Sequence, residues 1–184
     1  MLSPLRTGSA APGGCVVALL ILILVSGNAF PQSKAAPQKN PRPPRIVSIH
    51  FGLSSGMCYG YCSYELNVER GTAVLQAISQ GEDKQKCPDL KVSADLSETH
   101  WKELTESIDR DSLLSLPPKI GCPGCVDEPV ESIEVRFSDH AKMEIYYNAG
   151  DAPNELKALS ARLSALKEKL VKELPPTYAR RCEM

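Results

Sequence analysis

Cysteine is the residue type whose number and spacing in this sequence could do chemistry. Seven cysteines occur among 184 residues. Six of them follow an apolar N-terminal segment, namely Cys58, Cys62, Cys87, Cys122, Cys125 and Cys182. An even number of cysteines in an exported domain indicates disulfide bonds, but six cysteines can pair in many ways. The count therefore predicts disulfides without fixing their connectivity.

Two pairs of cysteines also have spacings that suit zinc. Three residues separate Cys58 from Cys62, and two separate Cys122 from Cys125. Four such thiolates match tetrahedral zinc coordination. The two pairs are much further apart than in a compact zinc ribbon, and thiols outside the cytoplasm oxidise readily. We therefore expect disulfides and no cofactor, with a zinc site of these four cysteines as the alternative.

The segment Cys122-Pro123-Gly124-Cys125 has the spacing of a thiol-redox pair. Redox chemistry needs the first cysteine at a helix N-terminus, which lowers the thiol pKa, whereas residues 126–129 lead into a strand pattern. Pro123 presets φ at the second position of a turn, and Gly124 accepts a positive φ at the third, so a type II turn is favoured. We expect Cys122 and Cys125 to be neighbours across this turn and bonded to each other, although the same turn would present two thiolates to one metal ion.

No catalytic residue is predicted. His50, His100 and His140 fall in a strand, a helix and a turn, without the mutual spacing of a ligand set. The sequence has no nucleophile elbow, phosphate-binding loop or zinc-protease motif. Tyr59 and Tyr61, beside the first cysteine pair, are the candidates for a ligand-binding rim.

The N-terminus has the pattern of a secretory signal peptide. Arg6 gives a positive start, residues 16–25 are all apolar, and small Gly27 and Ala29 precede the expected cleavage after Ala29. We therefore expect residues 1–29 to be removed. The alternative is an uncleaved membrane anchor, which is disfavoured because the apolar run covers only about half of a ~30 Å hydrocarbon core. The membrane would be a partner only in that case.

The remaining chain divides into a tether, one domain and a tail. Residues 30–44 contain five prolines and three basic residues and predict a solvated tether. Residues 45–174 form the domain, and residues 175–184 form a C-terminal tail. Alternating apolar residues predict four strands near 47–51, 64–69, 72–78 and 90–96 and a hairpin near 133–137 and 143–147.

Two helices complete the predicted domain. Ser97 is a natural N-cap for a helix that buries Trp101, Leu104 and Ile108 and ends before Pro117. The last helix carries a leucine stripe of Leu156, Leu159, Leu163, Leu166 and Leu170. The stripe is too short for a coiled coil, so packing on the sheet is favoured over a partner face. The fold predicted is α+β, in the order ββββ-α-ββ-α, with an antiparallel sheet of about six strands and both helices on one face.

The segment Cys58-Tyr59-Gly60-Tyr61-Cys62-Ser63-Tyr64, followed by a strand and Gly71, resembles the opening of domain of unknown function family 6438. Members show Cys-x-Gly-x-Cys-Pro-x-Tyr, so here Ser63 replaces the proline and Tyr64 falls one position early. A looser similarity extends the match over residues 46–171. The resemblance implies an exported bacterial domain with no established activity, and it lends no catalytic residue. It also implies that Cys58 bonds to Cys62, which leaves Cys87 and Cys182 to pair by elimination.

The function predicted is that of an exported, non-enzymatic envelope domain, periplasmic or extracellular, that binds or scaffolds an unidentified envelope component. The alternative is a periplasmic thiol-redox or zinc-binding protein that uses Cys122 and Cys125 with Cys58 and Cys62. A formal net charge of −1 gives no electrostatic reason to expect a nucleic acid partner.

Overall fold

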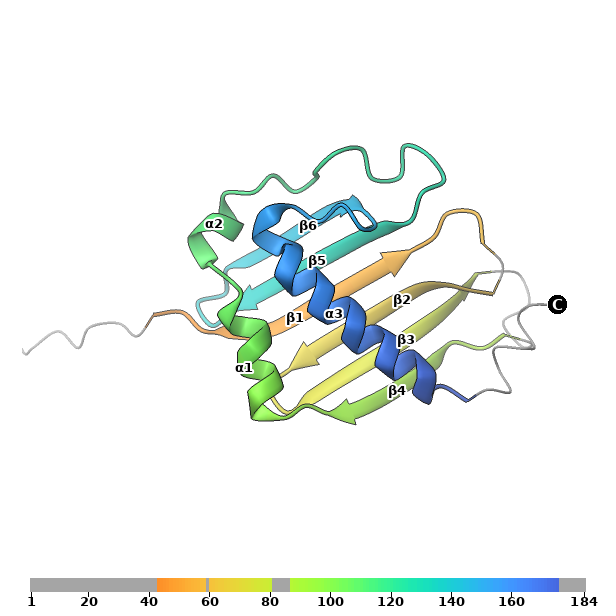
Figure 1. Ribbon diagram of the computed structural model, residues 1–184, viewed down its shortest axis with the longest axis horizontal. Helices are drawn as coiled ribbons and strands as arrows, with labels where there is room; N and C mark the ends of the chain where they lie inside the picture. The colour runs from red at the N-terminus through yellow and green to blue at the C-terminus, as the bar shows by residue number, and fades with distance from the viewer. Residues whose placement is uncertain (1–42, 59, 81–86, 176–184) are drawn as a thin grey trace, which may run out of the picture. The chain divides into compact units, whose positions relative to one another are not determined.

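The computed structural model describes residues 43–58, 60–80 and 87–175 (Figure 1). All of them belong to one of the two compact units of the chain, Arg42–Met184. The predicted signal peptide, nearly all of the tether, Tyr59, Cys182 and nearly all of the tail lie outside the described residues.

A six-stranded antiparallel sheet forms one layer of the domain. Its strands are β1 (Ile46–Ser54), β2 (Gly60–Glu69), β3 (Thr72–Gln80), β4 (Leu90–Asp95), β5 (Val130–Phe137) and β6 (Lys142–Asn148). They lie in the order β4-β3-β2-β1-β5-β6, and every neighbouring pair is antiparallel. The predicted α+β class and six-stranded sheet are confirmed.

One face of the sheet carries the apolar core. Alternate residues such as Phe51, Leu75 and Ile145 are fully buried on this face, as the period of two in a half-buried strand requires. The opposite face, here called the polar face, carries residues such as His50 and Asn67 and is covered by no described helix. The prediction of helices on one face is therefore correct.

Helix α3 (Asn154–Glu173) lies diagonally across the core face (Figure 1). Leu156, Leu159, Leu163 and Leu170 of its leucine stripe are at most 1% exposed within the core. Leu166 is only partly buried. The stripe therefore packs on the sheet rather than forming a free partner face.

The single helix predicted after Ser97 is two helices, so the order is ββββ-αα-ββ-α. Helix α1 (Glu98–Glu106) begins at Ser97, whose side chain accepts from the His100 N–H. Helix α2 (Arg110–Leu114) begins at Asp109, which accepts from the Ser112 N–H at 3.1 Å. Between them the Ser107 hydroxyl donates to the Leu104 carbonyl. Short polar side chains compete for backbone groups in this way and end one helix where the next begins.

One strand residue departs from the predicted alternation. Alternation over residues 47–51 places Val47 on the same face as Ile49 and Phe51, but Val47 is 52% exposed. The register of β1 against β5 shifts between Ile46 and Ser48. This irregularity turns Val47 out to solvent, because one extra residue reverses the direction of the side chains before it.

Candidate functional site

The described cysteines lie at one end of the sheet, with Cys62 near the start of β2 and the others in loops. β1 ends and β2 begins there, since Ser54 pairs with Ser63. β5 also begins there, since Ser54 pairs with Val130 on its other side. β3 ends and β4 begins at the same end. We call this the cysteine end of the sheet.

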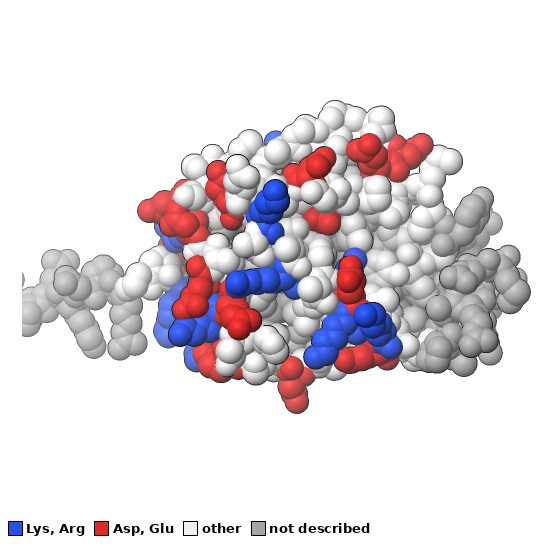
Figure 2. Space-filling view, viewed as in Figure 1, with Lys and Arg blue, Asp and Glu red and all other residues white. Residues whose placement is uncertain are grey.

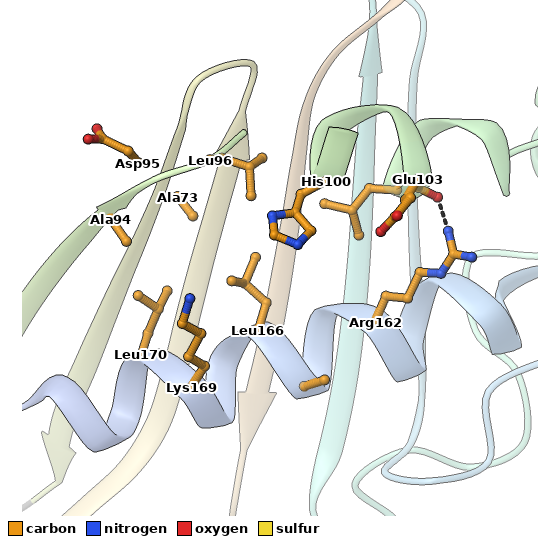
Figure 3. A pocket seen from close by; sticks show the side chains of 12 residues that line it. Ala73, Ala94, Asp95, Leu96, His100, Glu103, Arg162, Leu166, Lys169 and Leu170 are labelled. Carbon is orange, nitrogen blue, oxygen red and sulfur yellow. Dashed lines mark hydrogen bonds between the residues drawn. The ribbon is translucent and has the colours of Figure 1, made fainter. Parts of the chain in front are cut away.

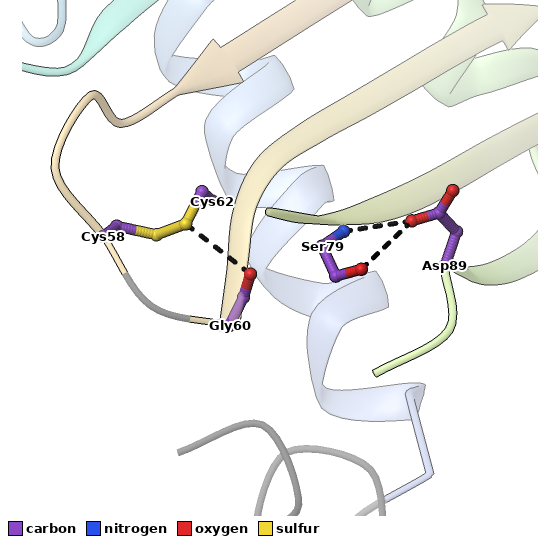
Figure 4. The surroundings of a disulfide bond; sticks show 5 residues. All are labelled: Cys58, Gly60, Cys62, Ser79 and Asp89. Carbon is purple, nitrogen blue, oxygen red and sulfur yellow. Dashed lines mark hydrogen bonds between the residues drawn. A yellow bond between two sulfur atoms is a disulfide. The ribbon is translucent and has the colours of Figure 1, made fainter. Parts of the chain in front are cut away.

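Two disulfides close short loops at the cysteine end. Cys58 is bonded to Cys62, with Cα atoms 5.7 Å apart (Figure 4). Cys122 is bonded to Cys125, with Cα atoms 5.4 Å apart. Cys87 is also disulfide-bonded, and its expected partner, Cys182, lies outside the described residues. Disulfides of this kind fit an oxidising compartment.

The turn between Cys122 and Cys125 has the geometry expected from its residues. The Cys125 N–H donates to the Cys122 carbonyl at 3.0 Å, and Gly124 has φ of +79°. Both cysteines are exposed, and residues 126–129, which form no helix, follow them before β5. No helix N-terminus is therefore available at this pair to stabilise a thiolate.

The described cysteines are paired in disulfides rather than gathered as metal ligands. Within residues 43–58, 60–80 and 87–175, no group of three or more His, Cys, Asp and Glu side chains is placed to hold a metal ion. Sulfurs bonded to each other also have no thiolate to offer. The three histidines, His50, His100 and His140, lie on β1, on α1 and in the β5–β6 turn respectively.

Of the predicted tyrosine rim, only Tyr61 can be placed. Its hydroxyl donates to the Pro88 carbonyl at 2.9 Å, which ties the start of β2 to the chain entering β4. Next to this contact, the Ser79 N–H donates to Asp89 at 3.0 Å (Figure 4). The Tyr61 hydroxyl thus has a structural contact at the cysteine end, between β2 and the segment before β4.

A buried polar cluster lies beneath α3. Ser160 and Glu131 are 7% and 8% exposed, and Tyr147 is fully buried. The Ser160 hydroxyl donates to Glu131 at 3.1 Å. Burial is the main reason that the pKa of Tyr147 lies well above its usual value. These groups are closed off from solvent, so we assign them to packing of the helix on the sheet.

A concave site open to solvent lies between α1, α3 and the β3–β4 edge of the sheet. It has a volume of about 300 Å³. Its apolar lining consists of Ala73, Ala94, Leu96, Leu104, Ala165, Leu166 and Leu170. The pocket exists because small side chains meet there. Ala73 and Ala94 are paired across β3 and β4, and they leave space beneath the helix.

Five exposed polar residues also line this pocket, namely Asp95, His100, Glu103, Arg162 and Lys169. His100 projects from α1 toward Leu166, and Lys169 projects from α3 on the opposite side (Figure 3). The His100 Nδ1 lies 3.0 Å from the Ser97 hydroxyl, which leaves Nε2 as the ring nitrogen available to a ligand. Asp95 lines the rim but points away from the pocket (Figure 3).

A hydrogen bond joins the two helices at one end of the pocket. The Arg162 guanidinium on α3 donates to the Glu103 carbonyl on α1 (Figure 3). Around the pocket, acidic and basic side chains are interspersed on the helical face rather than gathered by sign (Figure 2). The choice of ligand therefore depends on the groups that line the pocket rather than on the charge of the surrounding surface. These groups are an apolar floor and the nitrogen groups of His100 and Lys169 above it.

None of the described residues predicted as a site lines this pocket. Cys58, Cys62, Cys87, Cys122, Cys125 and Tyr61 lie at the cysteine end, whereas the pocket borders the edge strand β4. The only signals in the sequence were two alanines in neighbouring strand patterns and the fourth leucine of the stripe. Pairing Ala73 with Ala94 requires the register of β3 against β4, which alternation alone does not give.

Comparison with known proteins adds no relative. No protein-family model, no curated protein and no solved structure matches the chain. The similarity to domain of unknown function family 6438 stays a prediction. Among the described residues, no helix is long and apolar enough to cross a membrane.

Proposed function

We propose that this protein is an exported, non-enzymatic binding domain that takes a small amphipathic acid into the pocket between α1, α3 and β4. The apolar part of such a ligand would lie on the floor of the pocket, and its acidic group would face His100 and Lys169. The observation that carries the proposal is this convergence of an imidazole and an ammonium group over an apolar floor.

The chemistry of the two inward-pointing groups favours an acid over a base. An ammonium group offers only donors, and the free Nε2 of His100 becomes a second donor when the imidazole is protonated or carries its hydrogen there. A carboxylate would accept from both sides, and hydrogen bonds to charged groups are stronger than neutral ones. Export is supported by the signal-peptide pattern at residues 1–29 and by the disulfides at the cysteine end.

Titration with alkyl acids tests the proposal. The oxidised protein recovered after export is loaded with the fluorescent probe 1-anilinonaphthalene-8-sulfonate, and the probe is displaced with butanoate, hexanoate and octanoate. Each added methylene should tighten binding about fourfold until the pocket is full. Octanol and octylamine, which have the same chain without the acid, should displace the probe less well.

Matched lysine variants locate the site. Lys169→Gln should weaken octanoate binding and leave octanol binding unchanged. Lys157→Gln removes an exposed lysine from the same helix outside the pocket and should change neither. Equal binding of octanoate and octylamine, or equal effects of the two substitutions, would refute the proposed site.

A further inference from the structure

Among the described residues, another segment of the domain pairs with one edge strand of the sheet, β6, and none pairs with the other, β4. Along β6, the Ile120 N–H donates to the Tyr146 carbonyl at 2.9 Å, and the Tyr146 N–H donates to the Pro118 carbonyl at 3.0 Å. The segment before the Cys122–Cys125 turn therefore covers that edge. At the other edge, no described segment donates to or accepts from the outer side of β4. An uncovered strand edge is a template for another strand.

The direction of the backbone groups in β4 follows from its last hydrogen bond. The Leu96 N–H donates to the Gly71 carbonyl at 3.1 Å, so it points into the sheet toward β3. Backbone groups alternate in direction along an antiparallel strand. Those of Leu90, Val92 and Ala94 therefore also point toward β3. Those of Lys91, Ser93 and Asp95 point outward from the edge.

The side chains of these outward residues share one face. Lys91, Ser93 and Asp95 are all exposed, and they lie on the polar face because Val92 and Ala94 pack against the core. Neither Lys91 nor Asp95 has an ion-pair partner within the described part of the chain. The edge thus presents a cation, a hydroxyl and an anion at equal spacing.

We infer that β4 pairs with β4 of a second copy of this chain, antiparallel, around a two-fold axis at Ser93. In this register Lys91 lies directly opposite Asp95 of the partner, and Asp95 lies opposite the partner's Lys91. The three outward-pointing residues of each copy exchange backbone hydrogen bonds, and opposite charges meet twice. A two-fold contact of this kind is self-complementary and closed.

Charge makes this register preferable to the others that the edge allows. Two-fold pairing centred on Lys91 or on Asp95 would place like charges opposite each other on the axis, which is destabilising. Two-fold pairing centred on Val92 or Ala94 would place a charged residue opposite Ser93. Fewer of the outward-pointing backbone groups would then be hydrogen-bonded between the two copies. On the core side, the chosen register sets the half-buried Val92 against the partner's Ala94. A second copy is therefore the occupant that the edge itself specifies, and the inference does not depend on the ligand pocket.

Charge reversal tests the pairing. Sedimentation of the oxidised protein recovered after export should show a weak, concentration-dependent dimer. Lys91→Glu and Asp95→Lys should each raise the dissociation constant by about tenfold or more, because both contacts become repulsive. The double reversal Lys91→Asp and Asp95→Lys should restore the dimer.

Mixing the two single variants gives a further readout. Glu at 91 of one variant would meet Lys at 95 of the other, and Asp95 would meet Lys91, so the mixture should form a heterodimer that neither variant forms alone. Lys119→Glu, which reverses a charge beside the β6 edge, is the control and should leave the dimer unchanged. A chain that stays monomeric, or a dimer that the single reversals do not weaken, would overturn the inference.

Discussion

Replacing Leu163 tests how α3 is held on the sheet. This side chain is fully buried in the core, in the middle of the helix. Leu163→Ala removes the equivalent of three buried carbon groups, which at about 0.8 kcal/mol each gives roughly 2.4 kcal/mol. The cavity left behind raises the expected loss to about 3–4 kcal/mol of the free energy of unfolding.

Leu166, one turn further along the same helix, is the matched control. It is only partly buried and already borders the pocket, so Leu166→Ala leaves less new cavity. About half of the transfer free energy, roughly 1 kcal/mol, should be lost. The two variants share the helix, the substitution and the gain in helix propensity.

Urea denaturation measures both losses. Trp101 is the single tryptophan, and at 7% exposed it reports on the core by fluorescence. Circular dichroism follows the sheet and helices in parallel, and coincident transitions would justify a two-state analysis. Equal losses for Leu163→Ala and Leu166→Ala, or an unchanged midpoint for Leu163→Ala, would contradict the packing of the stripe on the sheet.

The other predictions concern the turn, the polar face and the N-terminus. Gly124→Val should cost about 1–2 kcal/mol in urea denaturation, because φ of +79° strains an L-residue, and Gly124→Asn should cost less. Burial alone would raise the pKa of Glu134, but hydrogen bonds from Lys142 and Arg136 lower it below its usual 4.5. These contacts therefore stabilise the fold above about pH 4.5, and this stabilisation is lost as the pH falls through the lower pKa of Glu134 in the folded protein. The urea midpoint of Glu134→Gln should therefore fall less steeply with acid than the midpoint of the unchanged protein. N-terminal sequencing of exported protein should begin at Phe30, and recovery of the full-length chain in membranes would speak for an anchor instead.

Local rules were enough to predict most of the elements. Alternation located the six strands, the Ser97 cap located the start of α1, and Pro123-Gly124 predicted the turn that brings Cys122 and Cys125 together. Each of these signals acts between residues close in sequence. They agree with the tertiary structure because local preference and core packing favour the same conformation there.

What the sequence did not reveal depends on register and on competition between neighbouring signals. The break between α1 and α2 arises where Ser107 and Asp109 offer hydrogen bonds that end one helix and begin another. The exposure of Val47 arises from a shift in pairing with β5, far along the chain. The pocket needs Ala73 and Ala94 to be paired beneath a helix that comes some sixty residues later, and no local pattern encodes that meeting.

The position of β1 in the sheet has a consequence for how the chain folds. β1 to β4 follow one another as neighbours, so each can form a hairpin with the strand just made, whereas the other side of β1 pairs only with β5. Until β5 arrives, the central strand of the finished sheet is an open edge of a nascent meander, and such edges promote aggregation. Short-range pairings close faster than long-range ones, so in pulse-labelling hydrogen exchange the β2–β3 amides should gain protection before those of β5. Helix α3 lies across the core face of the whole sheet. It can therefore complete its packing only after β5 and β6 have joined β1 to β4.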